Sequence, residues 1–134
     1  MKRRAFLAGT GAVMMAGPAL AVTAYMPGLV TKELNAGKTV FLDFKASWCT
    51  TCAAQERVIN ALKAENPAYE QAISFINVDW DEYGRSDLAR SLKIPRRSAL
   101  VVLKGNRELG RIVAGTGRDQ IKALMDTALA AAVA

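Results

Sequence analysis

The sequence predicts an α/β fold in which a mixed central sheet carries helices on both faces. Apolar runs of strand length alternate with longer segments whose apolar residues have helical spacing. The order is strand, helix, strand, then a hairpin and a closing helix, which fits a parallel crossover unit with an antiparallel edge. With 134 residues, 51% of them hydrophobic, the chain is long enough for one domain with its own core.

Local patterns define the elements of the first half. They are a short tether at 22–28, a helix at Leu29–Asn35, a buried strand at Thr39–Phe44 and a helix at Thr50–Glu65. In the long helix Val58, Ile59 and Leu62 share one face, which we expect to pack on the sheet. Pro67 ends this helix because proline disfavours helical geometry in the residue before it.

The second half supplies the remaining strands. We predict one more helical turn at 67–72, a central strand at Ile73–Val78, a polar loop at 79–84, a short helix at Ser86–Lys93, a strand at Ala99–Leu103, its hairpin partner at Glu108–Ala114 and a helix from Arg118 to about Ala131. The sheet then has both parallel and antiparallel neighbours.

The only two cysteines, Cys49 and Cys52, are separated by two residues. Cys49 lies at the junction between the strand and the helix, so we expect it on the first exposed turn of the helix, where unpaired N–H groups and the helix dipole favour a thiolate. We therefore predict a lowered pKa for Cys49, and Lys45 is a candidate for lowering it further. A disulfide that closes so short a loop stabilises a fold very little, so we interpret the pair as redox-active.

The segment "VFLDFKASWCTTC" resembles the signature of the thioredoxin superfamily, and the similarity extends from about residue 28 to about residue 131. The resemblance implies a thioredoxin fold in which Cys49 attacks, Cys52 resolves and Asp43 is a buried acid that relays a proton to or from Cys52. It also places Trp48 beside the substrate surface. Because apolar residues flank Asp43, we expect its pKa to be raised.

Two positions depart from the pattern of this superfamily, which usually carries a cis-proline before the strand at Ala99. Gap-free alignment puts Ser98 there, and Pro95 is the alternative; we prefer Ser98 because Pro95 suits the end of the preceding helix. A cis bond before a non-proline residue costs about 3 kcal/mol, so we expect a trans peptide. The groove is then reshaped, with Arg96 or Arg97 near the cysteines and available to a carboxylate of a partner.

The dipeptide between the cysteines is Thr50-Thr51, without the cationic residue expected of a strong oxidant. This favours a reductant. The predicted substrate-binding residues are Trp48, Thr50, Thr51, Arg97 and Ser98.

The first 21 residues have the pattern of a secretory signal peptide. A basic start at 2–4 precedes an uncharged stretch, and Ala19-Leu20-Ala21 has the form of a cleavage site. Arg3-Arg4 is also typical of twin-arginine export, although these arginines serve the general route equally well as positive charge. We expect a mature domain at 22–134 in the periplasm, with no stable membrane association after cleavage.

Charge and ligand content argue against other classes. Without Lys2, Arg3 and Arg4, 15 basic residues remain against 12 acidic ones, a net charge of +3, and no basic cluster interleaves with aromatic residues. We therefore expect no nucleic-acid partner. The chain has no histidine and no second cysteine pair, so we expect no zinc or copper site and no cofactor.

The sequence thus predicts an exported thiol–disulfide oxidoreductase that reduces disulfides of periplasmic proteins through Cys49 and Cys52. Two alternatives stay open: a disulfide oxidase or isomerase that uses the same pair, and a non-enzymatic metal carrier or assembly factor. The resemblance implies re-reduction by a membrane thiol-electron carrier. We expect a monomer.

Overall fold

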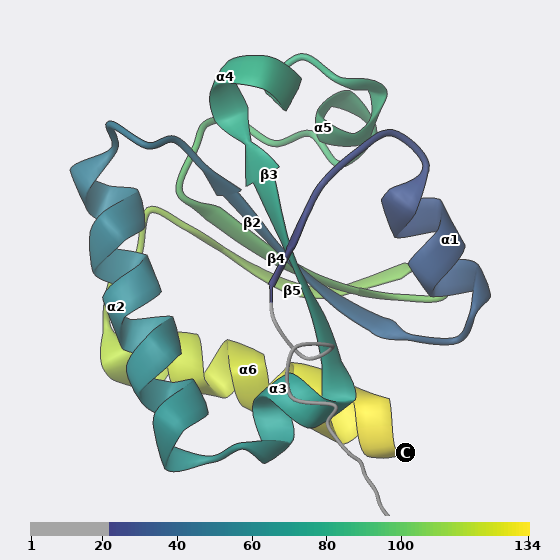
Figure 1. Cartoon of the computed structure of the whole chain (residues 1–134), viewed down its shortest axis with the longest axis vertical. Helices are drawn as coiled ribbons and strands as arrows, with labels where there is room; N and C mark the ends of the chain where they lie inside the picture. The colour runs from purple at the N-terminus through teal and green to yellow at the C-terminus, as the bar shows by residue number, and fades with distance from the viewer. Residues whose placement is uncertain (1–21) are drawn as a thin grey trace, which may run out of the picture.

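The computed structural model describes residues 22–134, and the predicted signal peptide at 1–21 lies outside them. The elements are β1 (Thr23–Ala24), α1 (Leu29–Asn35), β2 (Thr39–Lys45), α2 (Thr50–Glu65), α3 (Ala68–Ala72), β3 (Ile73–Asp79), α4 (Trp80–Tyr83), α5 (Asp87–Ser91), β4 (Ala99–Lys104), β5 (Arg107–Val113) and α6 (Arg118–Val133) (Figure 1). Within this part of the chain, no helix has the length and apolar character needed to span a membrane.

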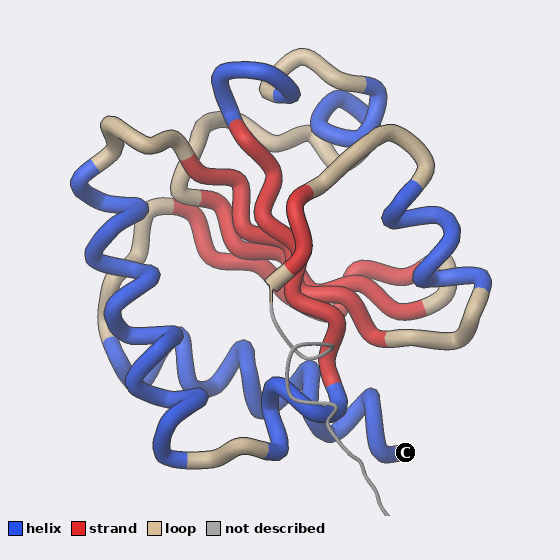
Figure 2. The backbone as a smooth tube through the Cα atoms, in the orientation of Figure 1, coloured by secondary structure: helices blue, strands red, loops and turns tan. Residues whose placement is uncertain are grey.

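The five strands form one mixed sheet in the order β1-β3-β2-β4-β5 (Figure 2). β1 and β2 run parallel to β3, whereas β4 is antiparallel to both β2 and β5. β2 is central, and its Asp43 lies opposite Asn77 of β3 and Leu100 of β4. The predicted mixed sheet is therefore confirmed, and the cysteines follow its middle strand.

Alternation along β2 divides the core into two layers. Phe41 packs in one cluster with residues of α2, α3 and α6, whereas Val40, Leu42 and Phe44 pack in a second cluster with residues of α1 and α5. Successive side chains of a strand point to opposite faces, so every residue from Thr39 to Phe44 is buried. Figure 1 shows α2, α3 and α6 together on one side of the sheet and α1 on the other, as the sequence predicted.

The structure corrects two expectations about local elements. The tether at 22–28 contains the edge strand β1, which is too short to show any periodicity in the sequence. The polar loop at 79–84 contains the helix α4, because the Asp79 side chain caps it by accepting from the Asp81 N–H at 3.1 Å. Trp80 of this helix packs edge-to-face on Phe44, with 6.5 Å between the ring centroids.

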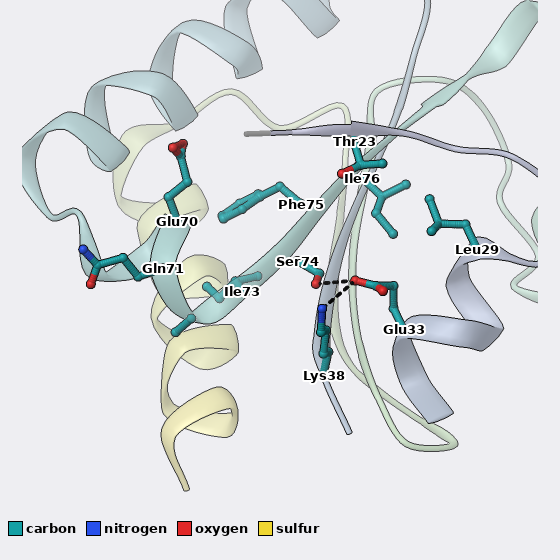
Figure 3. A pocket seen from close by; sticks show the side chains of 11 residues that line it. Thr23, Leu29, Glu33, Lys38, Glu70, Gln71, Ile73, Ser74, Phe75 and Ile76 are labelled. Carbon is teal, nitrogen blue, oxygen red and sulfur yellow. Dashed lines mark hydrogen bonds and ion pairs between the residues drawn. The ribbon is translucent and has the colours of Figure 1, made fainter. Parts of the chain in front are cut away.

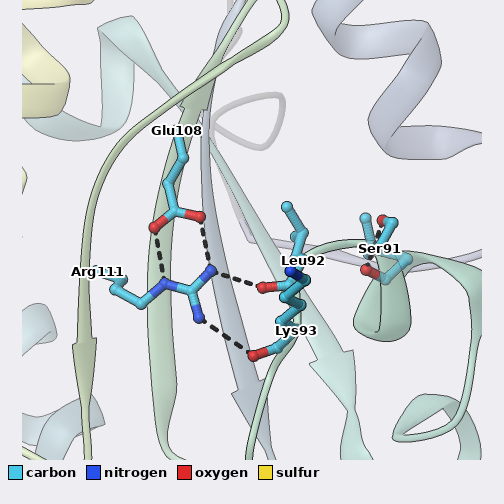
Figure 4. A network of polar contacts seen from close by, with 6 residues as sticks. Ser91, Leu92, Lys93, Glu108 and Arg111 are labelled. Carbon is cyan, nitrogen blue, oxygen red and sulfur yellow. Dashed lines mark hydrogen bonds and ion pairs between the residues drawn. The ribbon is translucent and has the colours of Figure 1, made fainter.

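An arginine of β5 anchors the chain segment that leads to β4. Arg111 pairs with both carboxylate oxygens of Glu108 and donates to the Leu92 carbonyl at 2.7 Å and to the Lys93 carbonyl at 3.4 Å (Figure 4). α5 ends at Ser91, earlier than predicted, and Lys93 takes a left-handed φ of 55°. The network thereby fixes the start of the loop at 94–98, which ends beside the cysteines.

Candidate active site

The Cys49 sulfur caps the first turn of α2. Cys49 is the N-cap residue, and its Sγ accepts a hydrogen bond from the Cys52 N–H at 3.1 Å. This N–H is one of the donors that the start of a helix leaves unpaired, so the sulfur takes the position of a capping oxygen. Negative charge on this sulfur is favoured because it lies at the positive end of the helix dipole.

The two thiols have different proton affinities. Burial raises the pKa of Cys49, but hydrogen bonds with the Cys52 side chain, the Ser98 hydroxyl, the Cys52 N–H and Arg97 outweigh it and lower this pKa to about 7. Burial raises the pKa of Cys52, and its hydrogen bond to Cys49 raises it further. Near neutral pH, Cys49 is therefore the thiolate of the pair. Lys45, a candidate for the same effect, pairs instead with Glu56, with 2.9 Å between Nζ and Oε1.

Cys49 is more enclosed than the sequence suggested. The residue is 4% exposed and clusters with Ala46, Cys52 and Trp80, so the expectation of an exposed first turn is wrong for this side chain. Both cysteines nevertheless line a surface hollow of about 410 Å³. A reacting sulfur can therefore approach Cys49 from this hollow.

Ser98 lies directly beside both sulfurs. Its Oγ is 3.2 Å from Cys49 Sγ and 3.1 Å from Cys52 Sγ, and the residue is fully buried. All peptide bonds in the described range are trans, which confirms the expected trans bond before Ser98. Pro95 is exposed. Ser98 therefore occupies the position next to the cysteines that the sequence left open between these two residues.

Gln55 holds the backbone around Ser98, a contact that the sequence analysis missed. This fully buried side chain of α2 donates from Nε2 to the Ser98 carbonyl at 3.0 Å and to the Gly115 carbonyl at 2.9 Å. Gln55 lies three residues after Cys52, so the same helical face carries both. A polar residue on that face was the available signal, but helix-forming composition accounted for it equally well.

Trp48 forms the exposed border of the site. It is 57% exposed, and its Nε1 donates to both carboxylate oxygens of Asp81, at 3.1 and 3.0 Å. Arg97 lies over the indole ring, with 4.7 Å between Cζ and the ring centroid. Of the two candidate arginines, Arg97 thus reaches the cysteine region, and Arg96 donates from Nε to the Arg97 carbonyl at 3.0 Å. No sequence pattern indicated the contact between Trp48 and Asp81.

Between the cysteines, Thr50 is exposed and Thr51 is partly buried, and both belong to the first turn of α2.

Asp43 is a buried acid beneath α2. It is 6% exposed, and burial raises its pKa to about 7, with Lys45 and Lys63 lowering it and Glu56 raising it. The predicted burial and raised pKa are confirmed. Asp43 borders a small cavity of about 20 Å³, which is large enough for one water molecule. Cys52 borders the neighbouring hollow, and Glu56 and Asn77 line both spaces.

A second hollow, of about 260 Å³, lies along the first half of β3 and away from the cysteines (Figure 3). Three of its polar side chains pair with one another: Glu33 accepts from the Ser74 hydroxyl at 2.8 Å and pairs with Lys38 at 3.5 Å. It contains no nucleophile comparable to a thiolate, so we place the active site at the cysteines. Residues 22–134 contain no group of three or more His, Cys, Asp or Glu side chains suited to a metal ion.

Comparison with known proteins agrees with this geometry. The family model described as Thioredoxin matches residues 28–127. Thioredoxin H2-1 of Oryza sativa subsp. japonica is 31% identical over 93 residues, which are 69% of this chain and 62% of that protein. A thioredoxin H-type of Fagopyrum esculentum is 33% identical over 90 residues, or 67% of this chain and 72% of that protein. The match thus spans less than two thirds of the rice protein.

Solved structures show the same similarity. Trxlp from Edwardsiella tarda EIB202 superposes with a TM-score of 0.65 at 25% identity, over 79% of this chain and 96% of that one. Thioredoxin NaTrxh from Nicotiana alata superposes with a TM-score of 0.61 at 28% identity, over 78% of this chain and 89% of that one.

Proposed function

Because the chain belongs to the thioredoxin family and carries a Cys-x-x-Cys pair, we propose that it is a thiol–disulfide oxidoreductase that reduces disulfides of other exported proteins. One observation carries the proposal. The Cys49 sulfur caps α2 at 3.1 Å from the Cys52 N–H and has a pKa of about 7, so a nucleophilic thiolate is available at neutral pH.

The reaction proceeds by two thiol–disulfide exchanges. The Cys49 thiolate attacks one sulfur of the substrate disulfide, and a mixed disulfide forms while the other substrate sulfur leaves as a thiolate. Cys52 then loses its proton and attacks Cys49 Sγ, which forms the Cys49–Cys52 disulfide and releases the second substrate sulfur. The substrate has gained two electrons, and the chain has lost them.

Asp43 is the proposed acceptor of the proton that Cys52 releases. A carboxyl group with a pKa of about 7 exchanges protons readily at neutral pH. Glu56 and Asn77 border both the cavity beside Asp43 and the hollow beside Cys52. Polar side chains therefore line the boundary between the proton donor and the proposed acceptor. In the reverse direction, Asp43 returns the proton when the pair is reduced.

The proposed substrate surface is made by Trp48, Thr50 and Thr51, which neighbour the cysteines in the chain, with Arg97 on the face of the indole and Ser98 beside both sulfurs. An exposed aromatic ring supplies apolar contact area for a peptide. The guanidinium of Arg97 offers charge to a carboxylate near the substrate disulfide.

A turnover assay tests the proposal. With dithiothreitol as electron source, the chain should accelerate reduction of insulin disulfides, and Cys49→Ser should return the rate to that of dithiothreitol alone. Equilibration with glutathione should give a potential nearer to about −270 mV than to about −120 mV. A value near −120 mV would favour the oxidase, and tight copper or zinc retention without turnover would favour a metal carrier.

We also propose export to the periplasm, on the basic start, the uncharged stretch and the cleavage pattern of residues 1–21. There a membrane thiol-electron carrier would restore the dithiol of the monomeric chain. In a Gram-negative host, mass spectrometry of the periplasmic fraction should find an N-terminus at Val22, and Arg3→Lys with Arg4→Lys should block export. A full-length chain confined to the cytoplasm would refute export, and normal export of the double variant would refute the twin-arginine route.

A further inference from the structure

We propose that Ser98 is a catalytic residue whose hydroxyl stabilises negative charge first on Cys49 and then on Cys52. Its Oγ lies 3.2 Å from one sulfur and 3.1 Å from the other, and all three residues are buried. The inference rests on the proposed function, because it assigns Ser98 a part in both exchange steps. A proline at this position has no hydroxyl to offer.

Three hydrogen bonds to the backbone of Ser98 fix the position of this residue. The Ser98 N–H donates to the Phe44 carbonyl at 2.7 Å, and the Ser98 carbonyl accepts from the Ala114 N–H at 2.8 Å and from Gln55 Nε2 at 3.0 Å. Ser98 also has a φ of 66°, in the left-handed region that non-glycine residues rarely adopt. A strained residue that persists in a fully bonded setting is typical of a functional position.

The Ser98 hydroxyl can donate a hydrogen bond to only one of the two sulfurs at a time. A serine hydroxyl has one hydrogen to donate and two lone pairs to accept with. In the reduced chain, Ser98 therefore donates to the Cys49 thiolate, while its Oγ lies equally close to the Cys52 sulfur. Its hydrogen bonds lower the pKa of both cysteines, so the hydroxyl favours the thiolate form of either sulfur.

The first exchange reverses this arrangement. Once Cys49 Sγ is bonded to the substrate sulfur, it no longer carries charge, and Cys52 becomes the nucleophile. Cys52 gives its proton to the base of the second step, and the Ser98 hydroxyl rotates to donate to the new Cys52 thiolate. Ser98 keeps its own hydrogen throughout, so the proton balance of the two exchanges is unchanged.

The charged groups around the two cysteines are paired with other residues or affect only one of the two sulfurs. Lys45 pairs with Glu56, and Asp81 accepts from Trp48. Arg97 lowers the pKa of Cys49 but is not among the groups that shift the pKa of Cys52. Asp79 lines the hollow that holds both cysteines. Ser98, which carries no charge, lies within hydrogen-bond distance of both sulfurs.

Ser98→Ala removes the hydroxyl and keeps a Cβ at the strained φ, so it isolates the hydrogen bonds. The probe is Ellman's reagent, because Cys49 attack releases one nitrothiobenzoate anion and Cys52 attack releases a second. Near neutral pH we expect both phases to slow about tenfold, and the pKa of Cys49, from the pH dependence of alkylation by iodoacetamide, to rise by about one unit. Above the pKa of both thiols, the difference in the first phase should vanish.

Two variants control for structure. Ser98→Gly also lacks the hydroxyl but relieves the left-handed φ, so it should be as slow as Ser98→Ala and at least as stable. It also serves if Ser98→Ala does not fold. Ser74→Ala removes a partly buried hydroxyl on β3, away from the cysteines, and should leave both phases unchanged.

The proposal is overturned if Ser98→Ala leaves either phase unchanged, or if Ser98→Gly reacts like the wild type. These outcomes are separable from failure of the proposed function, since Ellman's reagent requires no protein substrate. A wild-type chain that fails to reduce insulin would refute the reductase role, and the two phases would still test Ser98.

Discussion

The Arg97 guanidinium lies over the Trp48 indole, with 4.7 Å from Cζ to the ring centroid, while the Asp81 carboxylate accepts from the edge of the same ring at 3.0 and 3.1 Å. The exposed indole is thus held on its face by a cation and on its edge by an anion. Because both contacts restrict its rotation, the ring presents a fixed apolar surface beside the cysteine hollow.

Replacement of Arg97 should weaken recognition of acidic substrates. Arg97→Ala removes the cation over Trp48 and one group that lowers the pKa of Cys49. For a disulfide peptide with a carboxylate beside the cysteine, we expect kcat/KM to fall about tenfold or more, corresponding to about 1.4 kcal/mol. A neutral peptide should lose less, and added salt should reduce the difference between peptides.

Arg107→Ala is the matched control, since Arg107 is an exposed arginine at the start of β5. It should leave both peptides unaffected. Equal losses for the acidic and the neutral peptide with Arg97→Ala would contradict a role in charge recognition.

The two cysteines should behave differently when one is removed. Cys52→Ser leaves Cys49 able to attack but unable to release its partner, so a covalent adduct with the physiological substrate should accumulate. Non-reducing electrophoresis and mass spectrometry of the captured protein detect this adduct, and dithiothreitol should cleave its mixed disulfide. Cys49→Ser is the control, and an equal yield of adduct from it would mean that the roles of the cysteines are reversed.

Asp43 should make the folded chain less stable as the pH rises. Its pKa is raised from 3.8 to about 7, so between these values the folded chain holds a proton that the unfolded chain has lost. Stability therefore falls with rising pH across this window. Asp43→Asn has no buried carboxyl group to ionise. It should therefore be more stable than wild type by on the order of 4 kcal/mol above about pH 8, with little difference near pH 4.

Urea unfolding at the two pH values measures this effect. Asp119→Asn, at an exposed carboxylate in the first turn of α6, should change stability by less than about 1 kcal/mol at either pH. If Asp43→Asn were only as stable as the wild type at high pH, the pKa of Asp43 would not be raised by burial.

Gln55 should contribute to stability through the loops that it joins. Gln55→Leu removes the donor to the Ser98 and Gly115 carbonyls in a fully buried site. We expect a loss of about 2 kcal/mol in the free energy of unfolding, because buried acceptors lose a hydrogen bond. Gln71→Leu, at an exposed glutamine of α3, is the comparison in urea unfolding, and an equal loss there would refute the assignment.

The sequence by itself determined the elements that carry strong local signals. Periodicity, helix-forming composition and proline placement predicted α2 from Thr50 to Glu65, the central strands and α6, and the strand-to-helix junction placed Cys49 at a helix start. The apolar neighbours of Asp43, together with the resemblance to the thioredoxin superfamily, predicted that this acid is buried with a raised pKa. These properties depend on neighbours along the chain or on burial within one strand.

The tertiary structure decided between Ser98 and Pro95, the two residues that the sequence left as candidates for the position beside the sulfurs. Ser98 reaches both cysteines because its N–H bonds to the end of β2, and Gln55 meets its carbonyl across the same junction. The pairing of Lys45 with Glu56, and of Trp48 with Asp81, joins residues whose separation in sequence carries no periodic signal. Polar side chains at a surface have several possible partners, and only the packed arrangement of strands and loops selects one of them.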